Sequence, residues 1–209
     1  MRKVLVTSAH SDDSIIGMGG TLRKLTSNGY EVFVLSVCGD RITGFDDAIK
    51  MLGAKPLYFD YSYGKINEQR FSEELRKLFD QIDPQVVFTH WEKEILYDHQ
   101  LVSRQTMELA RNYEKEIYMF EIPASSIDFD FDMAVDITQF FEYRKKAIEL
   151  MKGAFEEKVY LKEILPSIVY APGFRGIQVG CDFAEVFKYC GSRFPLAPYR
   201  RKLVDIASI

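Results

Sequence analysis

Short apolar, β-branched runs alternate with segments of helical periodicity along the first 122 residues. The apolar runs are KVLVTSA at 3–9, EVFVLSV at 31–37, PLYFDY at 56–61, VVFTH at 86–90 and EIYMFEI at 116–122. The helical segments between them are 17–29, 44–53, 67–82 and 98–112. Such alternation is typical of a parallel sheet covered by helices on both faces. The pattern therefore predicts a doubly wound, mostly parallel, Rossmann-like α/β fold.

Helix ends are also marked. Gly29 and Gly53 lie where a left-handed residue commonly ends a helix, and Pro84 follows the third helical segment as a stop signal.

The pattern changes after Pro123. An acidic, aromatic stretch, SSIDFDFDMAVDIT, leads to a predicted long helix from about 139 to 157, and the tail contains APGFRGIQVGCDFAEVFKY. We find no repeat and no low-complexity linker, so we expect one domain over 1–209. Its core is expected at about 1–123, and its C-terminal extension, about 124–209, is expected to cap the sheet and to form a substrate wall.

Composition narrows the class of protein. A chain of 209 residues with 47% hydrophobic residues can bury a sizeable core, and a net charge of −4 does not fit a nucleic-acid partner. The first apolar run is too short for a signal peptide, and no stretch is long enough for a membrane span. The three cysteines form no CxxC pair, so we expect a reducing, cytoplasmic location. The sequence leaves the oligomeric state open, and a homo-oligomer is possible.

All three histidines fall in two loops that the fold should bring together. His10 follows the first strand, His90 ends the fourth, and His99 lies near the start of the next helix. In doubly wound sheets, ligands bind beyond the carboxyl ends of the strands where the strand order reverses, usually between the first and fourth strands. The sequence thus predicts one crevice that contains all the histidines.

Two carboxylates, Asp12 and Asp13, stand beside His10. Asp13 or Ser14 could simply cap the following helix, because Asp and Ser are favoured N-caps. Capping explains one carboxylate, whereas two adjacent carboxylates repel unless a cation or proton offsets them. Two imidazoles and one carboxylate suit catalytic zinc, which keeps an open position for water, and the second carboxylate is then free to accept the water's proton.

The chain resembles the LmbE/PIG-L family of zinc-dependent de-N-acetylases in five ordered blocks. AHSDDSIIGMGGTL resembles the family signature AHPDDE-x-x-G-x-GGT, and RITGFDDAIKMLGA resembles the region of its second helix. THWEKEILYDHQ resembles TH-x-x-x-D-x-H-x-DH, DIT and the helix after it resemble the next block, and RGIQVGCDFAEVF resembles the closing RG-x-x-x-G-x-x-x-AE-x-F. The resemblance covers nearly the whole chain.

The resemblance implies a role for each matched residue. It places the metal ligands at His10, Asp13 and His99, with Zn²⁺ or another divalent transition metal as the cofactor, and the general base at Asp12. It implies that Asp98 orients a neighbouring imidazole and that Arg41 contacts substrate or a reaction-centre oxygen. Arg175 and Glu185 match the closing block, where we expect structural ion pairing rather than catalysis.

Four positions depart from the family. Ser11 replaces a proline, Ser14 a glutamate, and Gly44 stands where the family often has a glutamate. Leu96 replaces the histidine that stabilises the oxyanion or protonates the leaving amine, which leucine cannot do. Loss of one preorganised donor typically costs about a hundredfold in rate. His90 is the first substitute to consider, although it also matches the family's own TH; Lys93, Glu94 and Tyr97 are weaker substitutes.

Three functions follow as hypotheses. The first is a metal-dependent amide hydrolase, resembling N-acetylglucosaminyl deacetylases, that removes an N-acetyl or similar N-acyl group from an amino-sugar compound. It would act through a metal-bound water and Asp12 as base. The second, motivated by Leu96, is a binding or scaffold protein that keeps the metal with little turnover. The third, a magnesium-dependent phosphatase-like hydrolase, is disfavoured because magnesium prefers oxygen ligands.

The substrate among N-acetylated sugars stays open. Four aromatic residues in the predicted strand-end loops could stack on a sugar ring: Tyr61, Tyr63, Trp91 and Tyr97.

Overall fold

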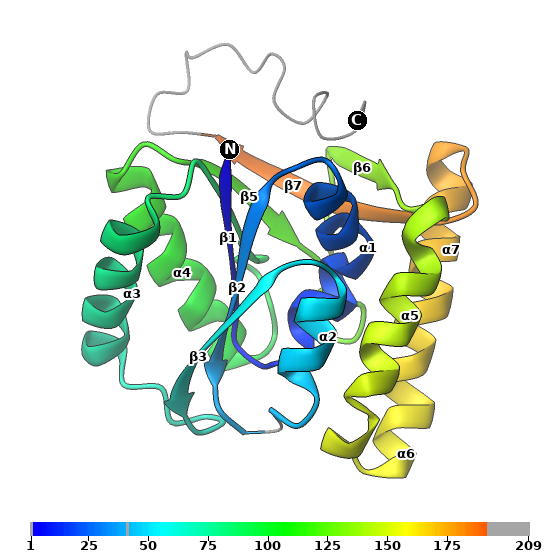
Figure 1. Cartoon of the computed structure of the whole chain (residues 1–209), viewed down its shortest axis with the longest axis horizontal. Coiled ribbons are helices and arrows are strands. Elements are labelled where there is room, and N and C mark those ends of the chain that lie inside the picture. Colours follow the sequence, from blue (N-terminus) through cyan, green and yellow to red (C-terminus); the bar gives the residue numbers. More distant parts are fainter. Residues whose placement is uncertain (1, 41, 192–209) are drawn as a thin grey trace.

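A seven-stranded, mostly parallel sheet forms the centre of the protein, seen in a computed structural model that describes residues 2–40 and 42–191 (Figure 1). The strands are β1 (Lys3–Ser8), β2 (Glu31–Cys38), β3 (Lys55–Tyr61), β4 (Val86–His90), β5 (Glu116–Phe120), β6 (Met133–Asp136) and β7 (Ala184–Gly191). Their order is β3-β2-β1-β4-β5-β7-β6, and β1 to β5 pair in parallel. The predicted α/β fold is confirmed.

Helices cover both faces of this sheet. On one face lie α3 (Glu68–Ile82) and α4 (Tyr97–Asn112); on the other lie α1 (Asp13–Ser27), α2 (Phe45–Met51) and α5 (Phe141–Leu150) (Figure 1). Strand side chains alternate between two cores, as a period of two requires. In β1, Val4 and Val6 join the core under α1 and α5, whereas Leu5 joins the core under α3 and α4.

The marked helix ends behave as predicted. Gly29 and Gly53 have φ values of +79° and +82°, a left-handed conformation that suits glycine because it has no Cβ. Helix α3 ends at Ile82, just before Pro84.

The C-terminal extension differs from the expected cap in one respect. Its strands β6 and β7 join the sheet itself, where β7 pairs antiparallel with both β5 and β6. Pairing with β7 supplies hydrogen-bond partners to the edge of β5, which a cap lying on a face would leave exposed.

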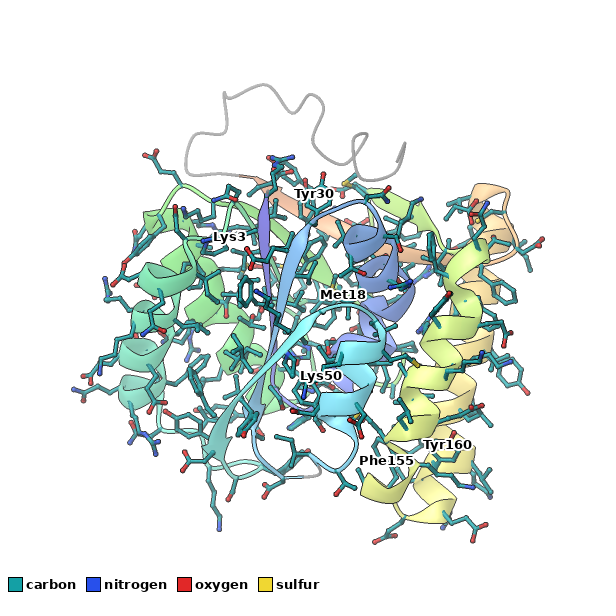
Figure 2. All side chains as sticks on the ribbon, in the orientation of Figure 1. Lys3, Met18, Tyr30, Lys50, Phe155 and Tyr160 are labelled. Atoms are coloured by element: carbon teal, nitrogen blue, oxygen red, sulfur yellow. The ribbon has the colours of Figure 1, made fainter. Side chains whose placement is uncertain are left out.

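The predicted long helix over 139–157 was wrong in extent. A short 3₁₀ turn, Thr138–Phe140, leads into α5, which ends at Leu150, and a 3₁₀ turn, Lys152–Ala154, reverses the chain. The chain then continues through α6 (Glu157–Val159), a π-helical turn at Tyr160–Ile164 and α7 (Leu165–Val179). Phe155 and Tyr160, labelled in Figure 2, lie at this turn with ring centroids 6.1 Å apart. The reversal lays α7 beside α5 (Figure 1), and Ile148 of α5 and Ile168 of α7 join the same buried core.

Strand order reverses between β1 and β4. The two are neighbours, with Val6 opposite Phe88, while β2 continues from β1 on one side and β5 from β4 on the other. The loops that follow β1 and β4 therefore lie next to each other at the carboxyl ends of the strands, as the sequence predicts. No helix within residues 2–40 and 42–191 is both long and apolar enough to cross a membrane.

Candidate metal centre

Three side chains from the two loops bring one ligand atom each to a common point. Asp13 opens α1, His99 lies in the first turn of α4, and His10 lies in the loop after β1. His10 Nδ1 is 3.2 Å from His99 Nε2, and Asp13 Oδ2 is 3.4 Å from each of these nitrogens. A tetrahedral ion with bonds of about 2.0–2.1 Å holds its ligand atoms about 3.3–3.4 Å apart. The three atoms therefore fit three corners of a zinc tetrahedron.

A carboxylate backs each of the two imidazoles. Glu94 Oε2 is 3.1 Å from His99 Nδ1, and Asp98 Oδ2 is 3.3 Å from His10 Nε2. A ring nitrogen that donates to a carboxylate leaves the other nitrogen with its lone pair for a metal. The two histidines are thus held in opposite tautomers, one presenting Nε2 and the other Nδ1.

The backing carboxylates are themselves held. The backbone N–H of Gly64 donates to Asp98 Oδ2 at 2.7 Å, and the hydroxyl of Ser126 donates to Glu94 Oε1. Burial opposes ionisation of Glu94, but hydrogen bonds from His99 and the nearby serines, together with the neighbouring His90, lower the pKa of the carboxyl. Both rings are therefore oriented by ionised groups fixed from outside the centre.

The charges of the centre favour a cation. Burial disfavours a charged His10, but the adjacent Asp13 carboxylate and the hydrogen bonds to Asp13 and Asp98 raise its pKa to about 12. Burial likewise opposes ionisation of Asp13, yet the neighbouring histidines hold the pKa of its carboxyl well below its usual range. The donor set thus takes up a proton where it would otherwise hold a metal ion, which fits a cation site.

Asp12 immediately precedes the ligand Asp13 in the chain. It occupies the N-cap position of α1 and is only 8% exposed, but its side chain makes no capping hydrogen bond to the helix. Its backbone carbonyl accepts the N–H groups of Ile15 and Ile16 instead. Capping therefore does not account for this carboxylate, and the role of general base stays a prediction.

His90 lies against the centre, with its Nε2 3.3 Å from Asp13 Oδ2. Its ring is fully buried and stacks on His99 with centroids 4.0 Å apart, and its Nε2 accepts the N–H of Ala9 at 2.9 Å. Burial, with the charge of His99, lowers the pKa of His90 to about 4. A neutral ring whose Nε2 already accepts a hydrogen bond is poorly placed to donate a proton there. The geometry favours a positioning role for His90.

The remaining residues that the sequence singled out, Leu96, Arg41, Arg175 and Glu185, are not among the three ligands and their orienting carboxylates. Leu96 is half-buried at the N-cap position of α4, and Arg41 lies outside the described residues. Arg175 pairs with Glu121, with Nη2 2.6 Å from Oε2, whereas Glu185 pairs with Arg144. The two residues of the closing block thus belong to two separate ion pairs.

The four aromatic candidates separate by burial. Trp91 and Tyr61 are buried, and the hydroxyl of Tyr61 donates to Glu74. Tyr63 and Tyr97 are 55% and 59% exposed, and the ring of Tyr63 stacks on His10 with centroids 4.8 Å apart. Tyr63 is therefore the candidate that the structure places at the centre itself.

Sequence reasoning missed two features of the centre. Cys38, at the end of β2, comes close enough to His10 and Asp98 to form a second potential metal-binding group. The only sign of this in the sequence was that Cys38 ends the second strand, which the expected strand order places beside the first. Glu94 was considered only as a weak proton donor, yet it orients His99; its position five residues before a ligand was the available signal.

The comparisons with known proteins agree on the fold. No family model matches the chain. The N,N'-diacetylchitobiose deacetylase from Pyrococcus horikoshii superposes with a TM-score of 0.80 at 20% identity, over 95% of this chain and 87% of that chain. The 4-carboxy-2-hydroxymuconate hydratase GalB from Pseudomonas putida KT2440 gives 0.77 at 20% identity, over 97% and 100%. A deacetylase in the biosynthesis pathway of teicoplanin gives 0.74 at 11% identity, over 90% and 96%. At these identities the likeness shows a shared fold, one that serves more than one reaction.

Proposed function

We propose that this chain is a metal-dependent hydrolase of the LmbE/PIG-L type that removes an N-acetyl or similar N-acyl group from an amino-sugar compound. The observation that carries the proposal is the triangle of ligand atoms from His10, Asp13 and His99. Asp12 is the residue that immediately precedes Asp13, at the N-cap of α1. The fold-sharing deacetylases of diacetylchitobiose and of teicoplanin biosynthesis support the reaction class by analogy.

In this proposal His10, Asp13 and His99 hold Zn²⁺ or another divalent transition metal. When bound, the ion supplies Lewis-acid polarisation of the acyl carbonyl and lowers the pKa of water. Asp98 and Glu94 hold the two imidazoles in position, and Arg41 contacts the substrate or an oxygen of the reaction centre.

Proton transfer falls to Asp12. Its carboxylate accepts a proton from the attacking water and returns it to the leaving amine, so the same group serves first as base and then as acid. Leu96 offers no donor, and His90 is turned away from this task by its bond to Ala9. The proposal therefore assigns the proton of the amine to Asp12 or to a group of the substrate, ahead of the weaker substitutes Lys93 and Tyr97.

The exposed ring of Tyr63 gives the substrate a stacking surface next to His10. An amino sugar fits this surface because its ring has an apolar face and its acylamino group can reach toward the ligands. We further propose a cytoplasmic location, because Cys38, Cys181 and Cys190 are all free thiols.

The test is an assay of the zinc-loaded protein over a panel of N-acetylated sugars, with released acetate as the readout. Asp12→Asn, which keeps the ligand set, is the matched control. Acetate release by the unaltered chain and none by the control supports the proposal. Absence of release over the whole panel, at full metal loading, contradicts it.

Two other functions are each favoured by one observation. GalB shares the fold over 97% of this chain, which by analogy supports a hydratase as a second candidate. Assay with 4-carboxy-2-hydroxymuconate would detect it. Leu96, which removes a donor from the centre, favours a metal-retaining binding protein; this would bind an acetylated sugar without releasing acetate even in a single turnover.

A further inference from the structure

Helix α1 is broken at Met18. The backbone there has φ −153° and ψ 26°, outside the helical region, so α1 consists of a first segment, 13–17, and a second, 19–27. Met18, labelled in Figure 2, is fully buried between α1 and the sheet. The first segment follows directly on the ligand loop and contains Asp13, so its direction determines where that ligand lies.

Glu185 occupies the start of the second segment. Its Oε1 accepts the N–H of Gly20 at 2.9 Å, and its Oε2 accepts the N–H of Thr21 at 2.7 Å. The first N–H groups of a helix have no partner within it, and a carboxylate is favoured at that end by the helix dipole. Glu185 comes from β7, 164 residues after Thr21, so a distant strand caps this segment.

Arg144 occupies the other side of the break. Its Nη2 donates to the carbonyl of Ile16, which the interrupted helix leaves open, and its Nε lies 3.4 Å from Glu185 Oε1. Both side chains are 2% exposed. One buried ion pair therefore joins the end of the first segment to the start of the second.

The glycines of GMGG allow this arrangement. A Cβ on Gly19 would lie 3.0 Å from Arg144 Cγ, and one on Gly17 would lie 2.5 Å from the ring of Phe120. Phe120 contacts His90, with centroids 4.9 Å apart, and His90 stacks on His99. The first segment thus carries one ligand, Asp13, and is linked to the ring of another, His99, through the rings of Phe120 and His90.

We propose that Arg144 and Glu185 are a positioning pair: by bridging the break in α1, they set the direction of segment 13–17 and thereby the place of Asp12 and Asp13 relative to His99. A continuous helix would satisfy the same backbone groups internally, so loss of the pair favours straightening of α1 and tilts its first segment. That this positioning serves a metal-dependent reaction rests on the proposed function. Neither side chain is assigned a contact with metal or substrate.

Arg144→Met and Glu185→Gln test the pair, with two readouts. Amide hydrogen exchange of the metal-free protein is measured over residues 10–17, and Co²⁺ affinity and visible absorption are measured by titration. Both variants are expected to exchange at least tenfold faster over 10–17, to bind Co²⁺ at least tenfold more weakly, and to change the cobalt spectrum.

Two controls separate positioning from general loss of stability. Arg175→Met removes the arginine of the separate pair with Glu121, and Phe79→Leu trims the fully buried ring of α3. Both should leave the exchange over 10–17 and the Co²⁺ affinity within twofold of the unaltered chain. The proposal is overturned if the two test variants also stay within twofold, or if Phe79→Leu shifts both readouts as far as they do.

If Arg144→Met or Glu185→Gln does not fold, the conservative variants Glu185→Asp and Arg144→Lys take their place. Each keeps its charge but changes the reach of the side chain, and each is expected to shift both readouts in the same direction by a smaller factor; unchanged readouts in both overturn the proposal. If the unaltered chain binds no Co²⁺, the proposed metal centre fails. The hydrogen-exchange rate over residues 10–17 then tests the positioning role of Arg144 and Glu185 by itself. A faster rate in the variants supports this role, and an unchanged rate overturns it.

Discussion

His10 and His99 present opposite ring nitrogens to the same point, with Nδ1 of the first 3.2 Å from Nε2 of the second. Each ring is turned this way by a carboxylate on its far nitrogen. The arrangement has consequences for metal binding that can be measured independently of any substrate.

Loss of a ligand should empty the centre without unfolding the chain. We expect His99→Ala to reduce bound metal from about one ion per chain to none, because two protein ligands hold zinc far more weakly than three. Elemental analysis of the dialysed protein, with circular dichroism to confirm folding, is the measurement. Unchanged metal content in a folded His99→Ala would exclude this residue as a ligand.

Loss of an orienting carboxylate should weaken the centre rather than abolish it. Glu94→Gln keeps the size of the side chain but removes the charge that faces His99 Nδ1. We expect metal affinity to fall by about 10- to 100-fold, the usual cost of such a change. Chelator competition measures it, with Glu92→Gln, an exposed neighbour, as the control.

Asp12→Asn should separate binding from chemistry. The amide cannot accept a proton from water, so we expect metal content within twofold of the unaltered chain and a loss of turnover of at least about a hundredfold. Metal content and released acetate are measured on the same preparation. Full turnover by the variant would remove Asp12 from the role of base.

Metal uptake should strengthen as pH rises. Burial opposes charge on His10 and His99, but the Asp13 carboxylate raises the pKa of both, to about 12 for His10, so both rings tend to hold a proton that the ion must displace. Raising the pH lowers the cost of that displacement, and the apparent affinity should increase by up to roughly tenfold per pH unit for each proton released. Zinc titrations from pH 6 to 8.5 in buffers of different ionisation enthalpy give both the affinity and the proton count. An affinity independent of pH would show that the rings are already neutral.

Leu96 and His90 should respond differently to substitution. Leu96→His restores a donor at the position where the family has one, and we expect turnover to rise at least about tenfold. His90→Ala removes the ring that stacks on His99, so we expect weaker metal binding, with turnover restored by excess zinc. If His90→Ala abolishes turnover at saturating zinc while Leu96→His changes nothing, His90 is the proton donor after all.

Much of this architecture follows from local pattern. Short apolar runs rich in β-branched and aromatic residues place β1 to β5, and the left-handed glycines Gly29 and Gly53 end helices, because both signals depend on neighbours within a few residues. The meeting of the loops that contain His10, Asp13 and His99 was also predictable, since a doubly wound sheet brings the ends of its first and fourth strands together. The choice of these three as ligands came from the family resemblance and stays a proposal.

Other features depend on contacts between distant parts of the chain. The long helix over 139–157 was predicted from periodicity, but the packing of α5 against α7 requires a reversal at Lys152–Ala154. The tautomers of His10 and His99 depend on which carboxylate faces each ring, and the break at Met18 is satisfied by Glu185 and Arg144, from β7 and α5. Period and composition record only what a residue does among its sequence neighbours. Whether a buried side chain is ionised, and which group it pairs with or caps, depends on groups that only folding brings within hydrogen-bond distance. These partners are therefore determined by the tertiary structure.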